Sequence, residues 1–183
     1  MLAGVAIGLR VFQLIFAIAI LGLAVTLVKA QVYGNAPTTT KYSTFTGGFG
    51  TFAAVVGALG LFLESIPDLL NIALDALSAV FFLAGGIAWA IGFQGIICKS
   101  DASEENARKM IENPLMNMGK NGQRYGWWDA GNSDDEREKI LLSSCQKGFS
   151  DEILQFIACG IGLGLIGVGY VRMRRGGLSA SYV

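Results

Sequence analysis

The chain has 183 residues, of which 52% are hydrophobic and only 15% charged, and its mean hydropathy is +0.51. Its 14 basic and 14 acidic residues cancel, and it has no histidine. These counts exclude a strongly basic nucleic-acid-binding surface, a histidine-based catalytic couple, an imidazole metal ligand and an intrinsically disordered chain. Segment 99–148 holds eight basic and nine acidic residues, 17 of the 28 charges. This distribution predicts a membrane protein with one sizeable solvent-exposed segment.

Four apolar stretches have the length of about 20 residues that a membrane-spanning helix needs. They are apolar on all sides, whereas the helices of a soluble bundle are amphipathic. We therefore expect an all-α integral membrane protein, one four-helix domain over 1–183. The predicted spans are about 5–29, 45–64, 69–97 and 150–172. The first apolar run is longer than a signal-peptide core, so we expect it to be retained.

The connections between these spans differ in length. Outer loops are predicted at 30–44 and 98–149, and a tight turn at 64–68, where Pro67 interrupts helical structure and Asp68 is a candidate helix cap.

Orientation is predicted from three basic residues directly after the fourth span, Arg172, Arg174 and Arg175. Basic residues next to a span favour the cytoplasmic side, which places the C-terminus there. Four crossings then place the N-terminus in the cytoplasm and both outer loops outside the cell. Lys29 and Lys41 oppose this assignment.

Two of the three cysteines bracket the long outer loop. Cys98 follows the third span and Cys145 precedes the fourth, so both lie on one side of the membrane. We expect a disulfide between them, which is stable in an oxidising compartment; the alternative is two unrelated free thiols. Cys159, inside the fourth span, is expected to be a small packing residue.

The long loop carries two helix signals. Asp101 and Glu104 have capping-box spacing, and the helical pattern that follows ends at Pro114. The cue recurs at Ser133 and leads to a second short helix that approaches Cys145.

Segment 117–132 lies between these two helices and is rich in glycine. It contains Tyr125, Trp127 and Trp128. These rings either rest on the lipid headgroups or the neighbouring loop, or form a contact surface for a partner protein. The acids at 134–136 lack the spacing of a calcium loop, so no metal site is predicted. The chain has no acceptor sequence for N-glycosylation.

Asp75 is predicted to be the only ionisable residue well inside a span. It lies about two turns from the start of the third span, and Arg10 lies at a similar depth in the first. We expect the two to form an intramembrane ion pair. The alternatives are a proton or ion relay at Asp75, or side chains that extend to the interface.

Glycine is abundant, with 25 residues. Small residues allow membrane helices to approach closely, and some of these glycines are expected to face lipid or a second copy of the chain. The predicted helix-packing positions are Gly57, Gly60, Gly85, Gly160 and Gly164.

The pattern of spans, loops and cysteines resembles the tetraspan membrane proteins of the MARVEL-domain family. The third span is similar to that of the fungal non-classical export protein 2 group, on the residues Leu74-Asp75-Ala76-Leu77, Val80-Phe81, Ala84-Gly85 and Cys98. The opening Met1-Leu2-Ala3 and Arg10 fit the same group.

This resemblance implies a multi-pass plasma-membrane protein that organises sterol- and sphingolipid-rich microdomains, the eisosomes of fungi. Roles in lipid sensing and unconventional export are also implied, and Asp75, Cys98 and Cys145 are the positions carried over. The outer loop is longer than the group's, so no loop function is carried over.

We therefore expect a non-catalytic organiser that acts through helix packing, lipid contacts and lateral association. Its expected partners are membrane lipids, further copies of the chain and a larger membrane protein, with no nucleic acid. We expect no cofactor, although a bound sterol or sphingolipid fits this function. The alternative is an accessory subunit of a larger membrane enzyme or transporter that docks through 99–148. A transport path within one chain is disfavoured, because the third span offers only Asn71, Asp75 and Gln94 as polar groups.

Overall fold

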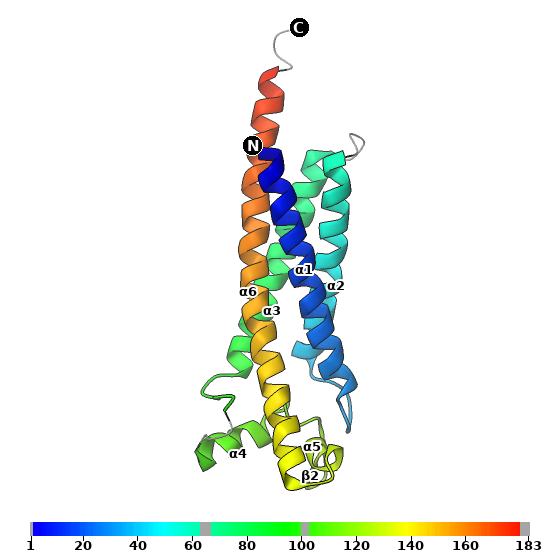
Figure 1. Ribbon diagram of the computed structural model, residues 1–183, viewed down its shortest axis with the longest axis vertical. Coiled ribbons are helices and arrows are strands. Elements are labelled where there is room, and N and C mark those ends of the chain that lie inside the picture. The colour runs from blue at the N-terminus through cyan, green and yellow to red at the C-terminus, as the bar shows by residue number, and fades with distance from the viewer. Residues whose placement is uncertain (1, 63–66, 100–102, 180–183) are drawn as a thin grey trace.

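The computed structural model describes residues 2–62, 67–99 and 103–179. Four long helices run side by side along the molecule (Figure 1). They are α1 (Leu2–Lys29), α2 (Thr38–Phe62), α3 (Asp68–Gly92) and α6 (Asp134–Ser179). The smaller elements are α4 (Glu104–Glu112), β1 (Lys120–Asn121), β2 (Arg124–Tyr125) and α5 (Gly126–Ala130). Each long helix contains a stretch long and apolar enough to cross a membrane, as predicted.

The four long helices form a closed ring. In this ring α1 packs on α2, α2 on α3, α3 on α6, and α6 on α1. Consequently α1 and α3 face each other across one diagonal, and α2 and α6 across the other. The small elements gather at one end, and the start of α1 and the end of α6 lie towards the other (Figure 1). We call residues 103–145 the cap, and the two ends of the bundle the cap end and the tail end.

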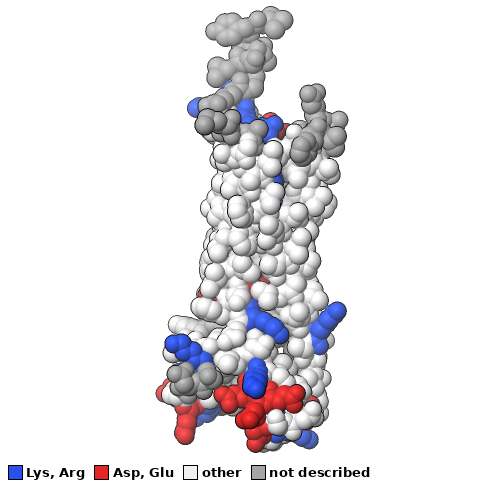
Figure 2. Space-filling model, in the orientation of Figure 1, with Lys and Arg blue, Asp and Glu red and all other residues white. Residues whose placement is uncertain are grey.

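Charged side chains are concentrated at the two ends of the bundle, mostly at the cap end. Figure 2 shows acidic and basic side chains gathered around the cap, an almost uncharged middle, and a few charges at the tail end. Large apolar side chains are exposed along the middle, on all four helices; examples are Phe12, Phe52, Leu83 and Leu163. An uncharged apolar belt of this kind is the surface that a bilayer requires.

The second span begins earlier than predicted. α2 starts at Thr38 rather than near residue 45. The polar residues that suggested a loop are compatible with a helix in two ways. The Thr44 hydroxyl donates a hydrogen bond to the backbone carbonyl of Thr40, one turn earlier. The side chains of Thr40 and Ser43 are buried between helices. α2 reaches Phe62, and most of the predicted turn at 64–68 lies outside the described residues.

α3 differs from its prediction at both ends. Its N-terminal cap position is Pro67, without a side-chain cap, and Asp68 is the first helical residue rather than a cap. The helix ends at Gly92, five residues before the predicted end, and a turn follows in which Gly95 has φ +74°. This left-handed conformation favours glycine and redirects the chain towards the cap.

The largest difference concerns the fourth span. The separate short helix predicted from Ser133 and the span predicted from residue 150 are one helix, α6, of 46 residues. At 1.5 Å per residue it is about 70 Å long, more than twice a hydrocarbon core of about 30 Å. The predicted gap between the short helix and the fourth span contains Gly148. This glycine packs against Trp89 of α3 and against Phe93, the residue after α3. Close packing therefore stabilises the helix where its composition suggested a loop.

Candidate functional site

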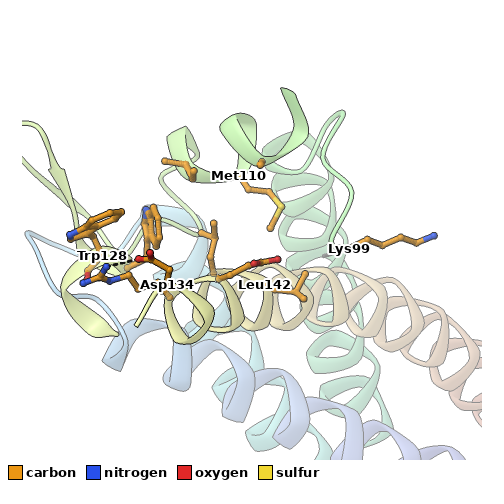
Figure 3. A pocket seen from close by; sticks show the side chains of 11 residues that line it. Lys99, Met110, Trp128, Asp134 and Leu142 are labelled. Atoms are coloured by element: carbon orange, nitrogen blue, oxygen red, sulfur yellow. Dashed lines mark hydrogen bonds and ion pairs between the residues drawn. The ribbon is translucent and has the colours of Figure 1, made fainter. Parts of the chain in front are cut away.

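The cap contains an apolar cavity of about 380 Å³ between α4, α5 and α6 (Figure 3). Met110 and Leu142 face it from α4 and α6, while Trp128 and Lys99 lie at opposite ends of it. Trp128 is 43% exposed, and the Arg137 guanidinium stacks 4.3 Å from its ring centre. The cavity therefore has an apolar floor and a charged rim.

The three predicted loop aromatics do not form one surface. Trp127 and Trp128 line this cavity, whereas Tyr125 lines a different one, of about 360 Å³, beside Tyr33 and Lys120. The ammonium of Lys120 lies 5.1 Å from the centre of the Tyr125 ring.

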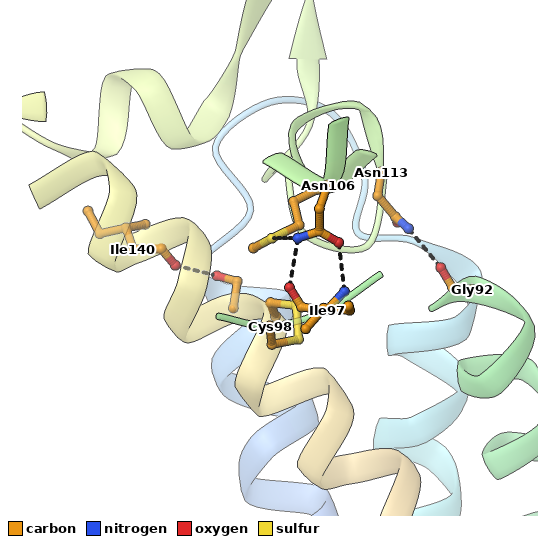
Figure 4. The surroundings of a disulfide bond; sticks show 9 residues. Gly92, Ile97, Cys98, Asn106, Asn113 and Ile140 are labelled. Carbon is orange, nitrogen blue, oxygen red and sulfur yellow. Dashed lines mark hydrogen bonds between the residues drawn. A yellow bond between two sulfur atoms is a disulfide. The ribbon is translucent and has the colours of Figure 1, made fainter. Parts of the chain in front are cut away.

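The predicted disulfide between Cys98 and Cys145 is confirmed, with Cα atoms 5.6 Å apart. Two asparagine side chains hold the segment before Cys98 against α4 (Figure 4). Asn106 exchanges two hydrogen bonds of 2.8 Å with the backbone N–H and C=O of Ile97, and Asn113 donates at 2.7 Å to the carbonyl of Gly92. Sequence reasoning missed both asparagines, because nothing in their spacing separates a tertiary contact from a surface residue.

Helix α4 begins with Ser103 as its cap, whose hydroxyl accepts from the backbone N–H of Asn106 at 3.4 Å. The predicted cap, Asp101, lies outside the described residues.

The connection between α1 and α2 also contacts the cap. The Tyr33 hydroxyl donates to Asp129 Oδ2 at 2.5 Å, and the backbone N–H groups of Val32 and Tyr33 both donate to the carbonyl of Met118. The hydrogen bond to Asp129 raises the pKa of Tyr33, because ionisation of the phenol would remove its donor beside a carboxylate. The α1–α2 connection and the cap thus form one unit, which sequence reasoning did not foresee.

At the tail end, the structure brings Arg10 and Asp75 together across the α1–α3 diagonal. The guanidinium donates to both carboxylate oxygens, at 2.5 and 2.8 Å, and the two residues are 7% and 1% exposed. Gln13 accepts from Arg10 at 2.8 Å and donates to Asp75 at 3.2 Å. The geometry is that of a bidentate, fully desolvated ion pair.

The predicted packing glycines have two different surroundings. A side chain at Gly57, Gly60 or Gly85 would collide with the Arg10 guanidinium, the Asn71 amide or the Gln155 amide respectively. These three positions therefore provide space for buried polar side chains.

Two predicted packing glycines face outwards. Gly160 has no atom within 4 Å of the position that a Cβ would occupy, and Gly164 meets only the end of Leu9, at 3.7 Å.

The predicted basic tail continues α6. Arg172 pairs loosely with Asp68, at 3.9 Å, and Arg174 lies over the Tyr170 ring. Arg175 belongs to the same helix, although its side chain is outside the described part of the structure.

A second buried polar group was missed. Asp151, on α6, is 0% exposed, so Asp75 is not the only buried carboxylate of the bundle. The Ser43 hydroxyl, from α2, donates to Asp151 Oδ2, and Gln155 Nε2 donates at 2.9 Å to both of these oxygens. Asp151 was overlooked because it sits at the start of the apolar run, where charges normally mark the membrane surface.

These features define a multi-pass four-helix membrane protein whose connecting segments at one end are closed into a disulfide-bonded cap. Residues 2–134 match the family model MARVEL, membrane-associating domain, and the chain therefore belongs to the MARVEL family. The match spans α1, α2, α3 and the cap, up to the first residue of α6. Comparisons with curated proteins and with solved structures found no match.

Proposed function

We propose that this protein is a non-catalytic organiser of sterol- and sphingolipid-rich microdomains in the plasma membrane, of the eisosome type. Within the MARVEL family we place it with the fungal non-classical export protein 2 group, on the third-span residues around Asp75. In this proposal the termini are cytoplasmic and the cap is extracellular. Family membership supports the general role in membrane association.

The observation that carries the proposal is the division between interior and surface of the bundle. Buried polar groups pair inside the ring, as Arg10 does with Asp75. Apolar side chains cover its outside on all four long helices. Such a surface interacts with lipids and with other helices.

Lateral association is supported by glycines on the outer face. Gly4 and Gly8 of α1, and Gly160 and Gly167 of α6, have no atom within 4 Å of the position that a Cβ would occupy. Because α1 and α6 are neighbours in the ring, these glycines form a surface without side chains on two adjacent helices. A second copy of the chain or a lipid can approach the backbone closely there.

The test is the mass and composition of the full-length protein purified in a mild detergent. A homogeneous assembly of this chain with enriched sterol or sphingolipid is expected. Replacement of Gly8 and Gly160 by isoleucine should reduce its mass, whereas Leu83→Ile, elsewhere on the apolar belt, should not. A monomer with the lipid composition of the bulk membrane would contradict the proposal.

The cap cavity favours a second candidate, an accessory subunit that docks on a larger membrane enzyme or transporter through 99–148. Its apolar floor and the exposed Trp128 form a surface suited to an apolar anchor of another protein. A stoichiometric large partner in the same purification, lost on Trp128→Ala, would favour this candidate over the organiser.

A further inference from the structure

The two buried carboxylates of the bundle differ in how their charge is compensated. Asp75 receives two hydrogen bonds from the Arg10 guanidinium. Asp151 is equally buried, yet it forms no ion pair within the described residues. Its Oδ2 accepts from Ser43 and Gln155, while its Oδ1 has no hydrogen-bond partner.

The surroundings of Asp151 are polar but uncharged. We call Ser43, Asp151 and Gln155 the Asp151 cluster. On α3, Trp89 packs on Gly148, one turn before Asp151, and its indole N–H lacks a partner. The Gln155 carbonyl oxygen, held against Gly85, also lacks a partner, as does the hydroxyl of Thr40, one turn before Ser43.

Charged side chains near the Asp151 cluster do not neutralise it in this structure. Lys147 precedes Asp151 by one turn of α6, but no ion pair joins the two. Glu152, the next residue, is half-buried and of the same sign, and Lys41 of α2 is exposed. α3 contributes Gly85 and Trp89, and no charge.

A carboxylate removed from water needs a positive charge or a full set of donors. Asp151 accepts hydrogen bonds at Oδ2 only, and the Trp89 indole N–H is the one further donor close to the carboxylate within the described residues. We propose that the Asp151 cluster is a binding site for one small cation, a proton or an alkali-metal ion, held at Oδ1 of Asp151. Binding is a simple association in which no electrons are transferred. A proton comes from water and forms an O–H bond, whereas a metal ion exchanges water ligands for carboxylate and neighbouring oxygens.

The position of the site restricts what it can do. Ser43 lies about one and a half turns from the start of α2, at the cap end, so the cation enters from that side. An apolar layer of Ala17, Ile20, Phe82 and Ala158 lies between the Asp151 cluster and Asp75. The site therefore holds a cation and does not continue into a path across the membrane. This inference is independent of the proposed organising function.

The experiment uses the full chain purified in a mild detergent and two probes. Infrared difference spectra between wild type and Asp151→Asn at neutral pH detect a protonated carboxyl group. Thermal unfolding in sodium chloride and in choline chloride of equal ionic strength detects alkali-ion binding. A carboxyl band that the variant lacks identifies a proton. A rise in Tm of about 4 °C with sodium in the wild type, absent from Asp151→Asn, identifies a metal ion.

Two matched variants test the assignment. Glu152→Gln should keep the wild-type response, because that side chain is outside the cluster. If Lys147→Gln alters the carboxyl band or the sodium-dependent rise in Tm as Asp151→Asn does, Lys147 supplies the missing charge and the proposal is wrong. It is equally wrong if the wild type shows neither a protonated carboxyl group nor a sodium effect. Carboxyl carbon shifts of ¹³C-aspartate in the wild type give the same readout without any variant.

Discussion

Arg10 reaches across the centre of the bundle to a helix that is not its neighbour in the ring. The pair with Asp75 joins α1 to α3, and the space for the guanidinium exists because residue 57 of α2 is a glycine. Three helices therefore depend on one arginine. A buried pair of this kind fixes which helices face each other, and removal of one partner leaves the other charge uncompensated.

We predict that Arg10→Met lowers the free energy of unfolding by about 3–5 kcal/mol, because Asp75 is left buried without its counter-charge. Arg10→Met combined with Asp75→Leu should recover most of this loss, since no charge then remains. Chemical unfolding in detergent, followed by tryptophan fluorescence, measures both. A double variant as unstable as the single one would show that the pair is not the cause.

Tyr33 provides a pH-dependent contact between the α1–α2 connection and the cap. Its hydrogen bond to Asp129 raises its pKa above the ordinary value of about 10. The contact therefore contributes fully below pH 10 and is lost as the pH rises through the folded-state pKa.

We predict that the difference between the ultraviolet titrations of wild type and Tyr33→Phe shows one tyrosine that ionises above the ordinary range. When the same pair is compared in an Asp129→Ala background, the pKa of Tyr33 should return towards about 10. An ordinary tyrosine titration in the wild type would contradict the hydrogen bond.

At the scale of the helices, glycine has two distinct roles that its frequency alone does not separate. Gly57, Gly60 and Gly85 lie where a polar side chain of another helix enters the contact, and Gly160 lies in open space. The sequence shows that these residues are small, but not which helix faces each of them. That depends on the order of helices around the ring.

We predict that Gly57→Ala destabilises the bundle by about 2–3 kcal/mol, because its Cβ overlaps the guanidinium of Arg10. Gly22→Ala, at an exposed position of α1, is the matched control and should be neutral, or stabilising by up to about 1 kcal/mol, since alanine favours the helix and meets no atom. Equal effects of the two substitutions on thermal stability would refute the distinction.

The number of membrane helices could be predicted from the sequence, and several of their boundaries could not. Long apolar runs identify spans because every backbone group in a bilayer needs an internal partner. The boundaries failed where tertiary contacts outweigh composition, at Thr38, where buried hydroxyls extend α2, and at Gly148, where packing on Trp89 keeps α6 continuous. Among the candidate sites, the disulfide could be predicted, because Cys98 and Cys145 lie after the third span and before the fourth, on the same side of the membrane. Asp151 was missed because its burial comes from α2 and α3.

The disulfide connects the end of α3 to α6 and encloses the small elements of the cap. With a sequence separation of 47, the chain-entropy estimate of its contribution is about 4 kcal/mol. We predict that Cys98→Ser with Cys145→Ser exposes segment 103–133 to protease while the apolar helices stay protected by detergent. Cys159→Ser, which changes the buried free cysteine, is the control and should leave the cleavage pattern unchanged.

At the scale of the whole molecule, polar and apolar layers alternate along the axis. The cap core around Trp89 and Met116 is followed by the Asp151 cluster, then the apolar layer around Phe82, then the pair of Arg10 and Asp75. The two polar layers cross different diagonals, α2 to α6 and α1 to α3. Together they join both opposite pairs of helices, so a different order of helices around the ring would break both sets of contacts.

This architecture places the start of α1 and the end of α6 towards one end and the cap at the other, which allows a direct test of orientation. Gln123→Thr creates an acceptor sequence for N-glycosylation at Asn121, in the exposed hairpin turn, in a chain that otherwise has none. If the arginines near the C-terminal end of α6 keep the tail end in the cytoplasm, the cap is translocated and the variant gains one glycan. The same acceptor sequence appended after Val183 should stay unmodified. Endoglycosidase-sensitive mobility of both variants, expressed in a eukaryotic cell, measures the result, and glycosylation of the tail instead of the cap would reverse the proposed orientation.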